Sequence, residues 1–337
     1  MAKVKITGHA SGTGVITVTA PNTSTDRTIT LPDSTDTLIG TATTDALTTR
    51  VNGAGGRKNM IINGAIQVSQ RGDYTTAVSV ANETYYQDRW TSVMNNGVAA
   101  TIQTKSTDQP NGQTGNCIRV ITSAGSSAAE CVVDQRVENP QWLAGRTLTF
   151  SVWMKSNTNK AGISHYNNQD SFVAPTNHTG GGAWEKLTLT HTVNSTAPTD
   201  FRLRLGMSQS GNTVVGVGDY FEITEAQVEL GSTATDFEHR SYGEELALCE
   251  RYYGHYSFNI QGYPPTSGFA HANVHFRQTM RATPTFTQTA GATSNTNGNA
   301  ANTDNITTKG FRIEHQTGGN NVRMYHIGGI AKLDAEL

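Results

Sequence analysis

The stretch QVELGSTATDFEHRSYGEELALCERYY (residues 227–253) divides the chain into two β-rich parts. It begins as the last of a series of strand-like runs and ends as a charged segment with helical spacing. Asp236 or Ser241 can cap the start of a helix here, and Glu244 and Glu245 then fall in its first turn, where negative charge complements the helix dipole. We therefore expect one short helix between two β units.

Apolar residues continue this helical pattern after the cap. Leu246, Cys249 and Tyr253 recur at helical spacing and predict an apolar stripe along one side of the helix. We expect Tyr252 and Tyr253, at its end, to pack around the shared axis of an assembly of identical chains.

Short apolar runs precede the helix and alternate with clusters of Gly, Asn, Asp and Pro. Regularly spaced runs of this kind, with no convincing helix between them, predict a β-sandwich resembling a jelly roll over residues 57–240. The runs are NMIINGAIQVSQ (59–70), DRWTSVM (88–94), GNCIRVITS (115–123), ECVVDQRVE (130–138), RTLTFSVWMKS (146–156), WEKLTLTHTV (184–193), FRLRLGMS (201–208) and DYFEITEAQVEL (219–230).

A second, smaller β unit is predicted to follow. Residues 241–337 contain the helix and then five further strand-like runs, from YYGHYSFNIQ (252–261) to NVRMYHIGGIAKLDAEL (321–337). The segment GATSNTNGNAANTDN (291–305) has few apolar residues and is expected to form an exposed loop. The whole chain is thus predicted to be mostly β.

Composition agrees with this fold class and argues against several functions. The 337 residues are only 35% hydrophobic and 15% charged, with 34 glycines, a mixture that suits short strands joined by turns. The net charge of −2 gives no basic surface for nucleic acid or anionic membrane. No apolar run is long enough for membrane insertion, and the first residues lack the apolar core of a secretory signal.

The three cysteines have no spacing typical of a zinc site or a disulfide framework. Cys117, Cys131 and Cys249 are therefore predicted to be buried or half-buried thiols in a chain that folds in a reducing cytoplasm.

The first 56 residues are predicted to need partners. Residues 14–32 alternate like a hairpin, residues 41–52 carry near-helical spacing, and GAGG (53–56) indicates a hinge. A lone hairpin and a weak helix bury little apolar surface, so oligomerisation is expected. The helical segment is either a small three-helix junction or an ordinary linker.

Several phrases resemble bacteriophage tail fibres and receptor-binding fibre proteins. They are GVITVTAPNTSTDRTITLPDSTDTLIG, NMIINGAIQVSQRG with YYQDRW, the stretch 227–253, and FRQTMRATPTF. The resemblance implies a homotrimeric virion protein that is assembled in the host cytoplasm. It further implies that residues 1–56 attach to the phage tail or to an adaptor protein, and that the far end binds a host surface glycan or an outer-membrane protein.

The resemblance extends to carbohydrate-binding modules, which often hold a structural calcium near the first and last strands of the sandwich. That comparison places a calcium near Asn63 and Glu229. The sequence shows no acid-rich loop there and indicates no other cofactor.

Catalysis is not expected. No GxSxG or HExxH motif is present, and nothing in the sequence fixes two of the available carboxylates as an acid–base pair. The phrase HANVH places His271 and His275 on one face of a strand, where a metal could bind, although solvated surface histidines are commoner.

Glycan binding needs aromatic faces and planar polar groups. In the sandwich, Trp142 and Trp184 stand beside turns and are candidates for stacking on sugars, with edge packing as the alternative. Trp90 and Trp153 lie within strand-like runs and are predicted to be core residues.

The C-terminal unit is richer in residues suited to recognition, because aromatic rings supply contact area at little entropy cost. Its receptor-binding candidates are Tyr256, Tyr263, Phe269, His271, His275 and Tyr325. The alternative functions are a purely structural tail or head fibre and, third, a glycan-degrading tailspike.

Overall fold

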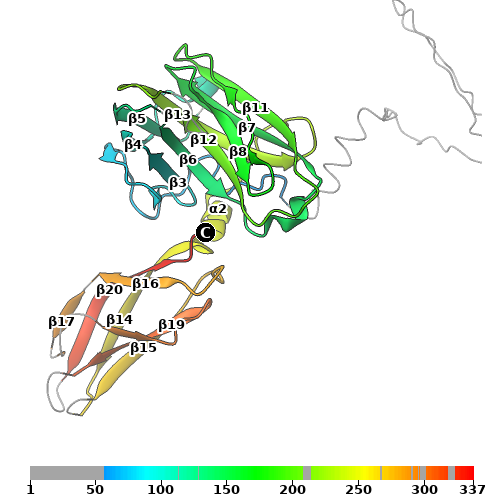
Figure 1. Cartoon of the computed structure of the whole chain (residues 1–337). Helices are drawn as coiled ribbons and strands as arrows, with labels where there is room; N and C mark the ends of the chain where they lie inside the picture. The colour runs from blue at the N-terminus through cyan, green and yellow to red at the C-terminus, as the bar shows by residue number, and fades with distance from the viewer. Residues whose placement is uncertain are drawn as a thin grey trace, which may run out of the picture. The chain divides into compact units, whose positions relative to one another are not determined.

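A computed structural model describes residues 57–112, 114–127, 129–207, 214–265, 268–289, 291–294, 296, 301–317 and 323–337. All of these belong to one compact unit, Asp45–Leu337. The hairpin, helical segment and hinge predicted for residues 1–56 lie outside the described residues. The described part of the chain is mostly β, as predicted, with two hydrophobic cores and one α-helix (Figure 1).

The first core lies between two antiparallel sheets. The six-stranded sheet has the order β1-β4-β5-β13-β7-β11. Its strands are β1 (Val78–Ser79), β4 (Ala99–Lys105), β5 (Cys117–Ala124), β13 (Tyr220–Leu230), β7 (Thr147–Ser156) and β11 (Trp184–Thr192).

The facing sheet has seven strands in the order β10-β8-β12-β6-β3-β2, with β9 paired to β8. Its strands are β10 (Thr176–Asn177), β8 (Ala161–Asn167), β12 (Phe201–Met207), β6 (Glu130–Arg136), β3 (Thr91–Asn95), β2 (Thr84–Tyr85) and β9 (Ser171–Phe172). Two short 3-10 turns, η1 (Pro110–Gly112) and η2 (Pro140–Leu143), lie in the connections.

Alternating side chains of both sheets fill the space between them. Phe150 of β7 stacks on His165 of β8, with ring centres 4.8 Å apart, and Phe201 of β12 extends the stack. Trp90 is also buried, as predicted, but Trp153 is only half-buried on the other face of β7, and the three free cysteines are buried thiols. The predicted β-sandwich is confirmed.

One run in this region is not a strand. Residues 59–70 form turns around Asn63, whose side-chain amide donates to the carbonyls of Val68 and Asp88 and accepts from the Val68 amide. The backbone N–H of Asn63 donates to the Glu245 carboxylate, at 2.6 Å. These side-chain bonds replace the ladder bonds of a strand, so the apolar alternation of this run is misleading.

Helix α2 (Tyr242–Glu250) begins after the second of the two predicted caps. Ser241 is its N-cap and forms a capping box with Glu244. The predicted apolar stripe is only partly correct: Cys249 is buried, but Leu246 is half-buried, and the carboxylates of Glu245 and Glu250 are buried. Arginines compensate these charges, because Glu245 pairs with Arg240 and Glu250 with Arg277.

The second core lies between two smaller antiparallel sheets after α2. One has the order β14-β20-β16, with β17 also paired to β20; the other has the order β15-β19-β18. The strands are β14 (Tyr253–Gly262), β15 (Phe269–His275), β16 (Thr285–Thr289), β17 (Ala292–Ser294), β18 (Asn302–Asp304), β19 (Gly310–Gln316) and β20 (Met324–Asp334). The predicted loop 291–305 therefore contains two short strands, β17 and β18.

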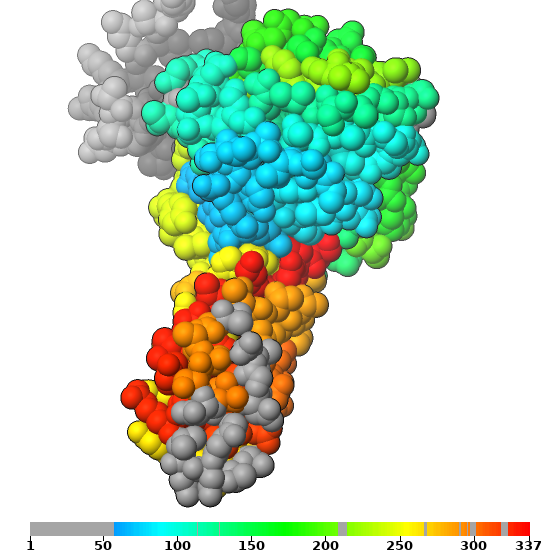
Figure 2. All heavy atoms as spheres, turned by 90° about the vertical axis from the view of Figure 1, so that its left-hand side faces the viewer, coloured from blue at the N-terminus to red at the C-terminus, as the bar shows by residue number. Residues whose placement is uncertain are grey.

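The last residues of the chain return to the first described ones. Arg71 pairs with Asp334 and Glu336, and Arg89 pairs with Glu336. The Tyr85 hydroxyl donates to the carbonyl of Leu337, at 3.0 Å. Figure 2 shows these C-terminal residues in red beside the residues in blue that open the sandwich. None of the helices in the described ranges has the length and apolar character needed to span a membrane.

Candidate functional site

The two sheets of the C-terminal domain leave one side open. Strands β14 and β15, each at one end of its sheet, contact one another. Strands β16 and β18 lie at the other end of their respective sheets. A hollow of about 680 Å³ opens beside β16 and β18. It is shallow and largely open to solvent.

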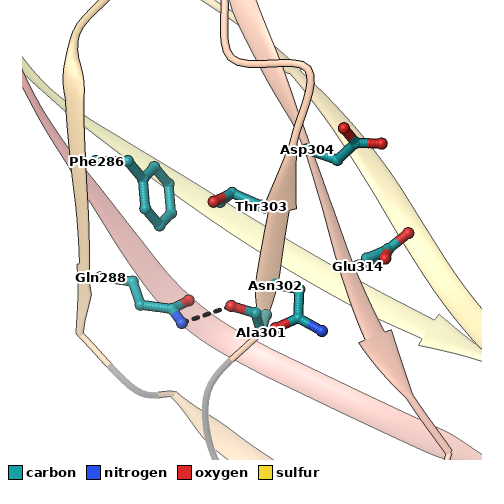
Figure 3. A pocket seen from close by; sticks show the side chains of 7 residues that line it. All are labelled: Phe286, Gln288, Ala301, Asn302, Thr303, Asp304 and Glu314. Atoms are coloured by element: carbon teal, nitrogen blue, oxygen red, sulfur yellow. Dashed lines mark hydrogen bonds between the residues drawn. The ribbon is translucent and has the colours of Figure 1, made fainter.

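Side chains from both faces of β18 line this hollow (Figure 3). Phe286 and Gln288 extend from β16 toward β18, and Thr303 extends from β18 toward Phe286. On the other face of β18 lie Asn302, Asp304 and Glu314. The hollow thus combines one aromatic ring with amide, hydroxyl and carboxylate groups.

The aromatic wall is held by the domain core. Phe286 is half-buried and meets Phe311 edge to face, with ring centres 5.2 Å apart. Gln288 donates its amide to the Ala301 carbonyl at 2.7 Å, while its side-chain carbonyl is buried without a hydrogen-bond partner. The Phe286 ring is therefore preorganised, and the side-chain carbonyl of Gln288 is a hydrogen-bond acceptor without a donor.

The polar wall is also preorganised. Arg312 pairs with Asp304 and lies 3.5 Å from the Glu314 carboxylate. The backbone amide of Asn305 donates to Asp304 at 2.7 Å. Two carboxylates thus share a single guanidinium here, and negative charge is in excess.

The outer face of the three-stranded sheet continues the polar wall. Phe269, His271 and His275 alternate with buried or half-buried residues along β15 and are exposed on this face. His271 stands opposite Glu314 in the strand register, and Asn302 stands opposite Glu314 on the other side. The prediction that His271 and His275 share one face of a strand is confirmed.

The other aromatic candidates of this domain are dispersed. Tyr263 is 70% exposed in the connection after β14, and Tyr325 is half-buried on β20. Tyr256 is buried in the domain core, where its ring tilts against Phe276 and its hydroxyl accepts from the Arg277 amide. Tyr256 therefore cannot serve as a surface contact, because the inward positions of β14 form the core.

The two sandwich tryptophans differ in environment. Trp142 is 50% exposed in η2, which leaves its ring available for stacking. Trp184 opens β11, is half-buried, and donates its indole N–H to the Asp108 carbonyl at 2.7 Å. Edge packing therefore describes Trp184, and the structure does not bring the two rings into one site.

The residues named for calcium are engaged by protein donors. The side-chain oxygen of Asn63 accepts from the Val68 amide, and the Glu229 carboxylate accepts from Gln227 and from the amide and hydroxyl of Thr235. This bonding does not fit calcium ligands at Asn63 and Glu229. Within the described ranges, no group of three or more His, Cys, Asp or Glu side chains is placed to hold a metal.

Several sandwich acids are paired with cations rather than with one another. Glu130 pairs with Arg204, Asp219 with Lys160, and Glu222 with Lys105 and Arg119. Burial raises the pKa of Asp88 and of Asp134 to about 6, opposed at Asp88 by bonds from Gln70 and at Asp134 by nearby arginines.

The hollow itself was not predicted from the sequence. Phe286 and Gln288 share a face of β16 by simple alternation, a signal present in TPTFTQT. Their proximity to residues 301–304 and to Glu314 depends on strand pairing over long sequence separations, which local patterns do not encode.

Comparisons with known proteins give structural likeness only. Neither the protein-family models nor the curated proteins include a match to this chain. Among solved structures, the enzymatically active domain of tailspike protein 4 of bacteriophage CBA120 is similar at 14% identity and TM-score 0.33, covering 51% of this chain and 21% of that one. This chain therefore spans about a fifth of the tailspike chain.

Carbohydrate-binding modules are also similar. The CBM22-1 xylan-binding domain of Paenibacillus barcinonensis Xyn10C matches at 12% identity and TM-score 0.31, covering 48% of this chain and 99% of that one. The C-terminal family 22 module of Clostridium thermocellum Xyn10B matches at 15% identity and TM-score 0.32, covering 46% and 99%. The β-sandwich assignment rests on the strand pairing in this chain.

Proposed function

We propose that the chain is a homotrimeric bacteriophage tail fibre whose C-terminal domain binds a host surface glycan without cleaving it. The observation that carries the proposal is the hollow at the open side of this domain. There, the preorganised ring of Phe286 lies near amide, hydroxyl and carboxylate groups, the combination that sugar rings and hydroxyls require. The resemblance of residues 227–253 to fibre proteins supports the virion setting, with residues 1–56 as the attachment segment.

Adsorption tests this function. Fluorescently labelled full-length chain is expected to coat susceptible bacteria saturably, to compete with the particle that carries it, and to lose binding after periodate oxidation of surface glycans. Competition without periodate sensitivity would indicate an outer-membrane protein as receptor. Absence of adsorption and of competition would favour a purely structural fibre.

Two further measurements address assembly and catalysis. Native mass measurement is expected to give three times the 36.1 kDa chain mass, and a stable monomer would contradict the trimer. Incubation with host polysaccharide is expected to release no reducing ends. Their release would instead establish a glycan-degrading tailspike.

A further inference from the structure

We propose that the hollow between β16 and β18 selects an uncharged oligosaccharide, with vicinal hydroxyls bound by Asp304 and Glu314, and rejects acidic sugars. This inference rests on the proposed function and adds the ligand class. It depends on three features of the hollow: its hydrogen-bonding balance, its charge and its aromatic wall.

The hydrogen-bonding balance favours a ligand that brings donors. The carboxylates of Asp304 and Glu314, which line the hollow and are partly exposed, are acceptors only. The Gln288 amide, which could donate to a ligand, is already bonded to the Ala301 carbonyl. A saccharide with free hydroxyls supplies donors, which the carboxylates of Asp304 and Glu314 can accept beside their existing bonds to Asn305 and Arg312.

Charge sets the selectivity. Asp304 and Glu314 are partly exposed, with side-chain exposures of 45% and 24%, and Arg312 is the guanidinium that pairs with both. One negative charge is left over, so a uronic acid or phosphorylated sugar would be repelled. A neutral sugar meets no such repulsion, and hydrogen bonds to a charged acceptor are the stronger kind.

The aromatic wall supplies the apolar contact. Phe286 is fixed by Phe311 and exposes part of its ring into the hollow, where the C–H face of a pyranose can pack. Because Phe286 and the carboxylates lie on opposite faces of β18, the ligand must extend across this strand. We therefore infer an oligosaccharide rather than a single sugar.

Saturation-transfer NMR on the full-length chain tests the selectivity. The probes are neutral oligosaccharides of mannose, galactose and glucose, set against oligogalacturonate as the acidic probe. At least one neutral probe is expected to bind saturably, and oligogalacturonate at least tenfold more weakly. Equal or tighter binding of oligogalacturonate, or no saturable neutral binding, would overturn the proposal.

Two variants locate the site. Phe286→Leu keeps an apolar side chain against Phe311 and is expected to weaken neutral binding about tenfold, equivalent to roughly 1.4 kcal/mol. Asp304→Asn is expected to weaken neutral binding similarly and to strengthen oligogalacturonate binding. The matched controls are Phe172→Leu and Asp73→Asn, at exposed residues of the sandwich. They are expected to change neither the binding of the neutral probe nor that of oligogalacturonate.

Unchanged binding in both hollow variants, with unchanged thermal unfolding, would overturn the assignment. If labelled chain still adsorbs to bacteria in a periodate-sensitive manner, the proposed function stands and only the ligand class fails. If adsorption itself is absent, the proposed function fails first.

Discussion

The guanidinium of Arg89 lies 3.6 Å from the centre of the Tyr252 ring and also pairs with the carboxylate of Glu336. Arg71 repeats this arrangement, 3.7 Å from the Tyr253 ring and paired with Asp334 and Glu336. Two sandwich arginines therefore contact both the segment that enters the C-terminal domain and the segment that ends it. Contacts to both ends restrain the joint more than a single linker would.

Removing the shared carboxylate is expected to weaken this joint strongly. The side chains of Arg89 and Glu336 are 2% and 4% exposed, so Glu336→Gln leaves a buried guanidinium without its charge partner. Losses of about 3–5 kcal/mol are typical of such changes. Urea unfolding of the full-length chain measures the loss.

Arg57→Gln provides the control for this prediction. Arg57 pairs with Glu244, and both side chains are more than 40% exposed, at 42% and 47%. Solvent screens such a pair, so a much smaller loss than in Glu336→Gln is expected. Equal losses in Glu336→Gln and Arg57→Gln would show that the buried pair does not stabilise the joint.

Two glycine substitutions are expected to change stability in opposite directions. A Cβ at Gly329 would lie 2.3 Å from the Phe258 ring, which is buried in the C-terminal core. Gly329→Ala should therefore cost about 1–3 kcal/mol through overpacking. A Cβ at Gly243, in the first turn of α2, meets nothing within 4 Å, so Gly243→Ala should stabilise the helix by up to about 1 kcal/mol.

Thermal unfolding of the two alanine variants checks these signs. A stabilising Gly329→Ala would mean that the Phe258 ring moves easily, contrary to its burial. A destabilising Gly243→Ala would mean that this glycine has a role in α2 that its open surroundings do not show.

Much of the sandwich could be predicted because strand alternation is local. Seven of the eight upstream runs coincide with strands, since each carries its own period of two. The run 59–70 is not a strand because Asn63 bonds to its own turn. Strands β4 and β8 and the two-residue strands β1, β2, β9 and β10 were not predicted. The cap of α2 was predicted for the same reason, because Ser241 and Glu244 are neighbours in sequence.

Features that depend on distant partners could not be predicted. Tyr252 and Tyr253 were expected to pack around an axis between copies, but Arg89 and Arg71 of the same chain cover them. Glu245 and Glu250 are buried because Arg240 and Arg277 reach them, which helical spacing does not reveal. That His271 and His275 share one face of a strand was predictable from local alternation. The hollow was not, because it is lined by edge strands of two different sheets.

The last prediction concerns acid sensitivity at His165 in the sandwich core. Burial, with a smaller repulsion from His191, lowers the pKa of His165 to about 3. An unfolded histidine has a pKa near 6.5, so below that pH the unfolded chain binds the extra proton and stability falls. Above about pH 6.5 the neutral His165 causes no such loss of stability. Below that pH the stability falls progressively toward pH 3, and the loss reaches about 2 kcal/mol at pH 5.

His165→Phe isolates this effect, because the ring packs nearly parallel to both Phe150 and Phe201 and neither of its nitrogens has a hydrogen-bond partner. The variant is expected to be at least as stable at pH 7, and its loss of stability between pH 7 and pH 5 should be smaller by about 2 kcal/mol. Asp88 and Asp134, whose raised pKa values act in the opposite direction, are present in both proteins and cancel. Chemical unfolding at the two pH values measures the difference, and an unchanged loss in His165→Phe would exclude His165 as its source.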